Sequence, residues 1–281
     1  MEGAIGPESP HSWRPPTDPF SEPFRPSGAV LVAGGIMWFA HAALMLSGFL
    51  VFALSGGLNA DPSGVLLAGL TVVGSLFAGI LASVLLGTAS FLLGAAIAAQ
   101  SSESIEATGS GETPTNLRKP GNRAGFFFLV FGASGILTIV ALAITGLSAS
   151  EATQAGSPDA LAAIFFLWAG ASVALVLAAE ALSGTLAQIR RDPAAAWTEP
   201  PSLRAYAYVN LVGVLLLAIP LLVVPISPRP SLVYGLVCIL VFGGLVAGFV
   251  APLVAFLTFS SVVRFGIRMA RGSGRERAAA P

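Results

Sequence analysis

Six long apolar stretches, almost free of charge, constrain the fold of this sequence more than any other feature. Each reaches the roughly 18 residues that mark a transmembrane helix, enough at about 1.5 Å per residue to cross a hydrocarbon core about 30 Å thick. They cover residues 28–55, 64–99, 124–147, 160–188, 205–226 and 231–263. Because a bilayer interior cannot pair exposed backbone groups, such segments cross it as helices. The sequence therefore predicts an all-α, polytopic integral membrane protein with six transmembrane helices.

Composition supports this class. Of the 281 residues, 55% are hydrophobic and only 10% are charged, whereas a soluble domain carries about 25% charged residues. An ordinary soluble enzyme is excluded, and we expect the lipid bilayer and no nucleic acid as a partner. The single cysteine, Cys238, lies inside an apolar run, so an intramolecular disulfide is impossible and redox chemistry is not expected.

The basic residues predict the orientation, because cytoplasmic flanks of membrane helices retain Lys and Arg. All but Arg229 of the 14 basic residues fall on alternate connections and on the two tails: Arg14, Arg25, Arg118, Lys119, Arg123, Arg190, Arg191, Arg204, Arg264, Arg268, Arg271, Arg275 and Arg277. Both termini are therefore predicted to be cytoplasmic. Since arginine greatly outnumbers lysine and Ala and Gly are abundant, we expect a GC-rich genome and a bacterial inner membrane.

Alternating long and short connections predict three consecutive helical hairpins, at residues 28–99, 124–191 and 205–271. The second and third hairpins both begin with Arg-Ala and both end on arginine. This pattern fits a repeated unit, and it also fits a shared hydropathy pattern without a repeat.

The two ends of the chain differ from this transmembrane domain. Residues 1–27 are polar and proline-rich and lack the pattern of a cleavable signal peptide, so we expect a disordered tail. That tail serves as a tether or docks to a partner groove. Residues 272–281 are predicted to form a basic cytoplasmic tail.

Small residues at helical spacing predict close helix packing. The residues concerned are Ser75, Gly79, Ser83, Gly87, Gly244 and Gly248. They suit packing within one bundle and, as an alternative, contact between two copies of the chain. The second helix of each hairpin is too long for a simple crossing, so it must tilt, break or project. Pro220 and Pro252 predict kinks or re-entrant geometry in the last two spans.

Motifs for enzymatic chemistry are poor. The string Gly132-Ala133-Ser134-Gly135 resembles the Gly-x-Ser-Gly nucleophile motif of rhomboid proteases, but both histidines, His11 and His41, precede it, so the later base that this family uses is missing. No histidine pair has metal-ligand spacing, and no phosphate-binding loop occurs. We therefore expect no enzyme, no metal site and no cofactor.

A few polar side chains inside the spans are the candidate site: His41, Ser134, Thr138, Glu180 and Asn210. His41 lies about 21 Å from the inner boundary, and we expect a neutral imidazole hydrogen-bonded to Ser134 or Thr138 of the third span. Proton or ion coupling, or axial ligation of a haem-like pigment, are its alternatives. Glu180 is either interfacial or a coupling site, and Asn210 is expected to donate a hydrogen bond between helices.

Two functions follow from these features. The one favoured by the sequence is a non-enzymatic membrane subunit or scaffold that packs with another membrane protein or with a second copy of itself. The alternative is a small-solute or ion transporter that uses His41, Glu180 and Asn210.

Overall fold

The computed structural model describes residues 22–55, 62–108, 114–151, 158–189, 203–226 and 230–271. Within these ranges the chain is helical throughout. The elements are a 3-10 helix η1 (Glu22–Phe24) and the α-helices α1 (Arg25–Leu54), α2 (Pro62–Thr108), α3 (Pro114–Glu151), α4 (Pro158–Ile189), α5 (Leu203–Ile226) and α6 (Pro230–Arg271). All six α-helices are long and apolar enough to cross a membrane, which confirms the predicted fold class.

Proline marks where most of these helices begin. Pro62, Pro114, Pro158 and Pro230 are the first residues of α2, α3, α4 and α6. A proline is favourable there, because its fixed φ suits a helix and its missing N–H would have had no partner in the first turn. Three of these prolines, Pro62, Pro158 and Pro230, begin the second helix of each hairpin.

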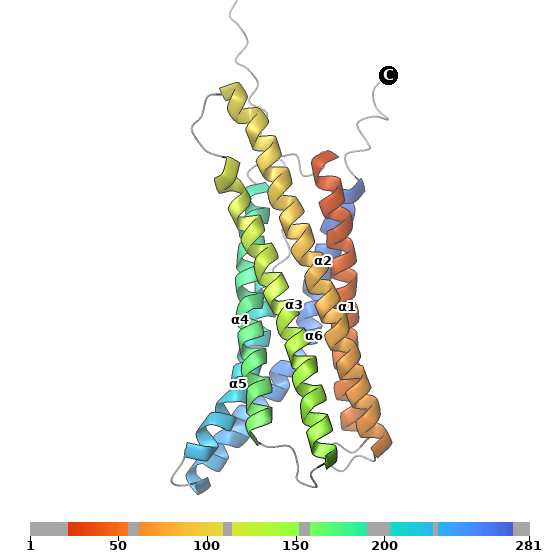
Figure 1. Ribbon diagram of the computed structural model, residues 1–281, viewed down its shortest axis with the longest axis vertical. Helices are drawn as coiled ribbons and strands as arrows, with labels where there is room; N and C mark the ends of the chain where they lie inside the picture. Colours follow the sequence, from red (N-terminus) through yellow and green to blue (C-terminus); the bar gives the residue numbers. More distant parts are fainter. Residues whose placement is uncertain are drawn as a thin grey trace, which may run out of the picture.

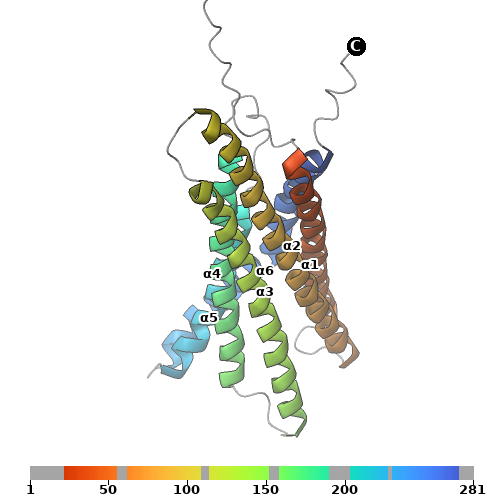
Figure 2. The ribbon, with the colours of Figure 1, turned by 45° about the horizontal axis from the view of Figure 1, so that its top comes forward.

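The six helices form a closed ring (Figures 1 and 2). Each helix packs against its neighbours in sequence, and α6 packs against α1, so that the last hairpin meets the first. The start of α1 and the end of α6 lie at the same end of the bundle. All Lys and Arg of the described residues also belong to this end, because they occur where α1, α3 and α5 begin and where α6 ends.

The longest helices extend beyond a simple crossing. With 47 residues, α2 is about 70 Å long, and it runs unbroken past the ends of its neighbours on the side of the termini (Figure 1). Of the three predicted outcomes, a break is therefore absent from the described part of α2. Both α5 and α6 continue as helices through Pro220 and Pro252, so re-entrant geometry is absent from their described parts. Their far ends lean away from the other helices (Figures 1 and 2).

Glycine allows two pairs of helices to cross closely. A Cβ on Gly28 of α1 would lie 2.7 Å from the backbone nitrogen of Ala270 and 2.9 Å from the carbonyl oxygen of Gly266 on α6. A Cβ on Gly121 of α3 would lie 2.7 Å from the Cα of Gly94 on α2. No other residue fits at such distances, so these glycines set the separation of α1 from α6 and of α2 from α3.

The predicted small-residue positions of α2 are all buried inside the ring. Ser75 and Gly79 lie against His41 of α1, whereas Ser83 and Gly87 lie against α3. In α6, Gly244 lies against Leu217 of α5 and Gly248 lies near Phe49 of α1. These positions therefore pack within one copy of the chain.

The outer surface of the ring is apolar. Large side chains such as Leu70, Ile239 and Leu257 are 60%, 70% and 76% exposed, respectively. Such a surface would be a severe liability in water, but it is what the hydrocarbon core of a membrane requires. The protein is therefore an integral, multi-pass membrane protein whose helices face lipid.

Candidate functional site: a cavity inside the helix ring

The centre of the ring is held by one tryptophan. Trp38 of α1 is fully buried and stacks on Phe259 of α6 and Phe131 of α3, with ring centroids 4.9 and 5.6 Å away. It also meets the ring of Tyr206 of α5 edge-on at 5.7 Å. Four helices therefore share a single indole, and such aromatic contacts add to the energy of simple burial.

The Trp38 ring matters more than its N–H group. Its Nε1 has no hydrogen-bond acceptor in suitable geometry among the described residues, although the Tyr206 side chain lies near enough to interact with it. A buried N–H without a partner costs about 1–3 kcal/mol. The packing of the ring must offset this cost.

A cavity lies beside Trp38 and is lined by residues from all six helices. It consists of two adjoining lobes. The residues that line both lobes are His41, Met45, Trp168, Tyr206, Asn210 and Val214. One lobe extends to α2 and α3 at Gly79 and Phe131, and the other extends to α6 at Gly248. Each lobe offers about 70 Å³ to the centres of water molecules. Since one water needs about 10–15 Å³ by this measure, each lobe has room for several waters or a small solute.

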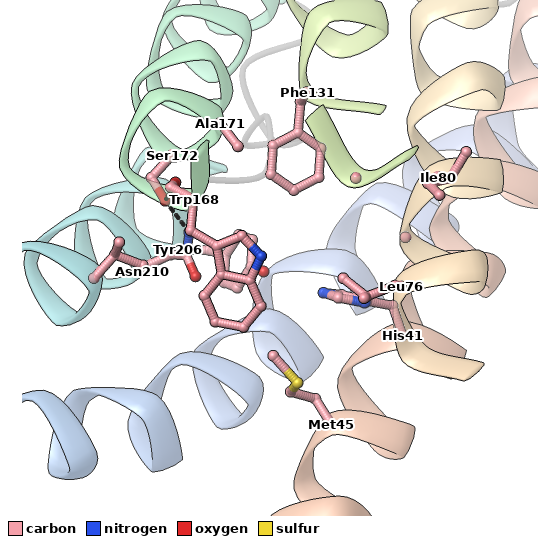
Figure 3. A pocket seen from close by; sticks show the side chains of 13 residues that line it. His41, Met45, Leu76, Ile80, Phe131, Trp168, Ala171, Ser172, Tyr206 and Asn210 are labelled. Carbon is pink, nitrogen blue, oxygen red and sulfur yellow. Dashed lines mark hydrogen bonds between the residues drawn. The ribbon is translucent and has the colours of Figure 1, made fainter. Parts of the chain in front are cut away.

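His41 projects from α1 into this cavity, toward Trp168 (Figure 3). Its Nδ1 lies 2.8 Å from the carbonyl oxygen of Ser75 and 2.9 Å from the Ser75 hydroxyl, both on α2. A Cβ on Gly79 would lie 3.0 Å from the same nitrogen. The glycine therefore leaves the space that the imidazole occupies, and the serine one turn away fixes its orientation.

These contacts determine which nitrogen of His41 carries the proton. A carbonyl oxygen only accepts, so Nδ1 must donate to Ser75. The cavity is lined by no Asp or Glu among the described residues, and an unpaired charge inside a membrane is expensive. The imidazole is therefore neutral, with Nε2 as a hydrogen-bond acceptor on the side facing the cavity.

Asn210 of α5 is held across the cavity from His41 (Figure 3). Its Nδ2 donates to the hydroxyl of Ser172 on α4 over 2.9 Å, which is the interhelical bond that the sequence predicts for it. The Ser172 hydroxyl in turn donates to the carbonyl oxygen of Trp168 over 2.8 Å. Because that hydroxyl has used its own proton, it can only accept from Asn210, and the amide orientation follows.

The predicted hydrogen bond from His41 to the third span is wrong. Ser134 donates to the carbonyl oxygen of Val130, and Thr138 donates to that of Ser134, so both hydroxyls bond within α3. His41 bonds instead to α2, the other helix of its own hairpin. Depth in the membrane could not distinguish Ser75 from Ser134 and Thr138 as the partner, because Ser75 on α2 also lies at the depth of His41.

Glu180 lies apart from this cavity. Its carboxylate forms an ion pair of 2.9 Å with Arg204 at the start of α5, and the Tyr208 hydroxyl donates to it over 3.3 Å. The two charged side chains are 38% and 50% exposed. Glu180 therefore belongs with the basic end of the bundle, where an exposed pair contributes little to stability.

Several cavity residues were not among the predicted site residues: Phe131, Trp168, Ser172 and Tyr206. The position of Trp168 within its span could have identified it as a site residue. Trp and Tyr favour the two membrane interfaces, whereas Trp168 follows several apolar residues of its span. The same signal applies to Trp38, which lies still deeper in its own span.

The described residues include no group of three or more His, Cys, Asp or Glu that could hold a metal ion. No protein-family model, curated protein or solved structure matches the chain. The function must therefore be inferred from the cavity itself.

Proposed function

We propose that this protein carries a small solute across the membrane and that the solute binds in the central cavity. The supporting observation is the closed ring, in which all six helices contribute side chains to one space beside the buried Trp38 and the aromatic rings around it. Binding sites for small molecules are mostly apolar, with a few oriented polar groups. His41 and Asn210 are such groups, since each is fixed by a bond to a neighbouring helix.

The scaffold that the sequence favours receives less support from these contacts. A scaffold would use the small-residue faces to contact its partner, but the described positions on α2 are buried by α1 and α3. A scaffold also needs no polar, oriented interior, because such groups are costly in a membrane protein. Of the predicted disordered tail, residues 1–27, residues 1–21 lie outside the described residues. The prediction is wrong for residues 22–27, which are helical and include the buried Phe24 and Ser27.

Uptake by proteoliposomes tests the carrier function. The purified protein should accelerate entry of at least one class among labelled small amines, amides, alcohols and carboxylates, relative to protein-free liposomes. Ala171 lines the cavity, so Ala171→Leu should lower this uptake at least about tenfold by filling the space. Val173, on the same helix, is 46% exposed to the outside, and Val173→Leu should leave uptake unchanged.

The carrier proposal fails if no class enters faster than through lipid alone. It also fails if Ala171→Leu transports as well as Val173→Leu, because the solute would then cross elsewhere.

We further propose that the basic end of the bundle faces the cytoplasm of a bacterial cell, following the positive-inside rule. Reporter fusions after Pro281 should be active inside the cell, and fusions within residues 56–63 or 148–159 should be active outside. A C-terminus that reports from outside would reverse the orientation.

A further inference from the structure

We propose that the cavity takes a small amine or amide, held by N–H donation to His41 Nε2 and Asn210 Oδ1, and that it turns away acceptor-only solutes such as carboxylates. This inference rests on the proposed function, since it names the chemistry of the solute in the same cavity. Its test measures binding without transport, so the two proposals can fail separately.

The first acceptor is His41. Nδ1 donates to the Ser75 carbonyl oxygen over 2.8 Å, which leaves Nε2 of the neutral ring without a proton. Nε2 makes no hydrogen bond with any residue that the structure describes. The ring projects into the cavity (Figure 3), so an acceptor faces the space where a solute would lie.

The second acceptor is Asn210. Its amide nitrogen is fixed on Ser172, whose own proton goes to Trp168. The amide cannot turn over without placing its oxygen against a hydroxyl oxygen that has no proton to give. The Oδ1 atom of Asn210 accepts no hydrogen bond within the described part of the chain. The residue lines both lobes of the cavity.

The remaining walls favour the same class of solute. No charged residue is among the described lining residues. An anion would therefore find no positive charge to offset the loss of its water, and an ammonium group would find no carboxylate but would find two hydrogen-bond acceptors. The rings of Phe131, Trp168 and Tyr206 form part of the wall, and aromatic faces attract ammonium groups. The Tyr206 hydroxyl can donate or accept, so it does not discriminate.

The experiment is saturation-transfer NMR on the full-length protein in lipid nanodiscs, with empty nanodiscs as the reference. The four probes are methylammonium, acetamide, acetone and acetate, each of which has a methyl signal. Acetamide and acetone are both neutral and nearly equal in shape, and they differ in the N–H groups. Acetamide and methylammonium should bind at least about tenfold more tightly than acetone and acetate, since one lost hydrogen bond of this kind costs about that factor.

Variants assign this preference to the two acceptors. Asn210→Leu and His41→Phe should each weaken methylammonium binding at least about tenfold. Asn210→Asp keeps an oxygen at the site and should bind methylammonium at least as well as the natural chain. Val173→Leu, on the outer surface of α4, is the matched control and should leave binding unchanged.

Equal binding of acetone and acetamide overturns the inference, and this comparison needs no variant that must fold. Tighter binding of acetate overturns it as well, as does unchanged binding in both Asn210→Leu and His41→Phe. Uptake of carboxylates with no binding of amines would contradict this inference alone. Binding of amines without uptake of any solute would contradict the carrier function alone.

Discussion

Replacing Gly28 by valine is expected to open the ring of helices. Even the first carbon of a side chain would meet the α6 backbone at 2.7 and 2.9 Å, at Ala270 and Gly266. Backbone cannot move aside as a flexible side chain can, so α1 and α6 must separate. Overpacking of a tight contact costs about 1–3 kcal/mol and occasionally more. We expect Gly28→Ala to lie in this range and Gly28→Val to exceed it.

The measurement is the free energy of unfolding in mixed detergent micelles, with the melting temperature as a second readout. Gly170→Ala is the matched control, because a Cβ there meets nothing within 4 Å. It should be neutral or slightly stabilising, since alanine favours a helix more than glycine does. A Gly28→Val protein as stable as this control would mean that α1 and α6 do not cross closely.

Truncating Trp38 to alanine should be nearly as damaging. The indole joins α1 to Phe131, Tyr206 and Phe259 on three other helices. In soluble proteins, such truncations cost about 3–5 kcal/mol. Part of that cost comes from the transfer of the side chain to water. This part is smaller in a membrane protein, because its helices separate into lipid. We therefore expect a loss of about 3 kcal/mol, mostly from lost contacts and the space left behind.

The conservative variant separates the Trp38 ring from its N–H group. Because Nε1 has no acceptor in hydrogen-bonding geometry among the described residues, Trp38→Phe should cost less than about 1.5 kcal/mol. Ile36→Ala, on the lipid-facing side of the same helix and 53% exposed, should also be mild. If Trp38→Phe is as damaging as Trp38→Ala, the N–H group donates a hydrogen bond that contributes to stability.

The sequence predicts the elements of this fold well, because a bilayer reduces the possibilities to helices of sufficient length. The six predicted spans agree with the six helices. The closure of the ring, in contrast, could not be predicted from the sequence. The contact of α1 with α6 depends on Gly28 and Gly266, which are far apart in sequence, and no local pattern identifies them as partners.

The candidate site could be predicted only in part, for a related reason. A lone histidine in an apolar span is visible from the sequence, and so is its need for a partner on another helix. Which helix supplies that partner depends on how the helices rotate against one another. The small residues at Ser75 and Gly79 did indicate a closely packed face of α2. They did not reveal that His41 fills the space above Gly79.

The carrier function requires that water and small solutes reach the middle of the ring, and cysteine labelling measures this access. Cysteine introduced at Ala171 in a Cys238→Ala protein should react with a small hydrophilic thiol reagent, because Ala171 lines the cavity. Val173 lies on the same helix but is exposed on the outer surface, where lipid excludes such reagents. We predict that Ala171→Cys reacts at least about tenfold faster than Val173→Cys in intact membranes and is protected by a bound solute. Equal, slow reaction at both positions would contradict the carrier function, because it would mean that the centre of the ring is sealed.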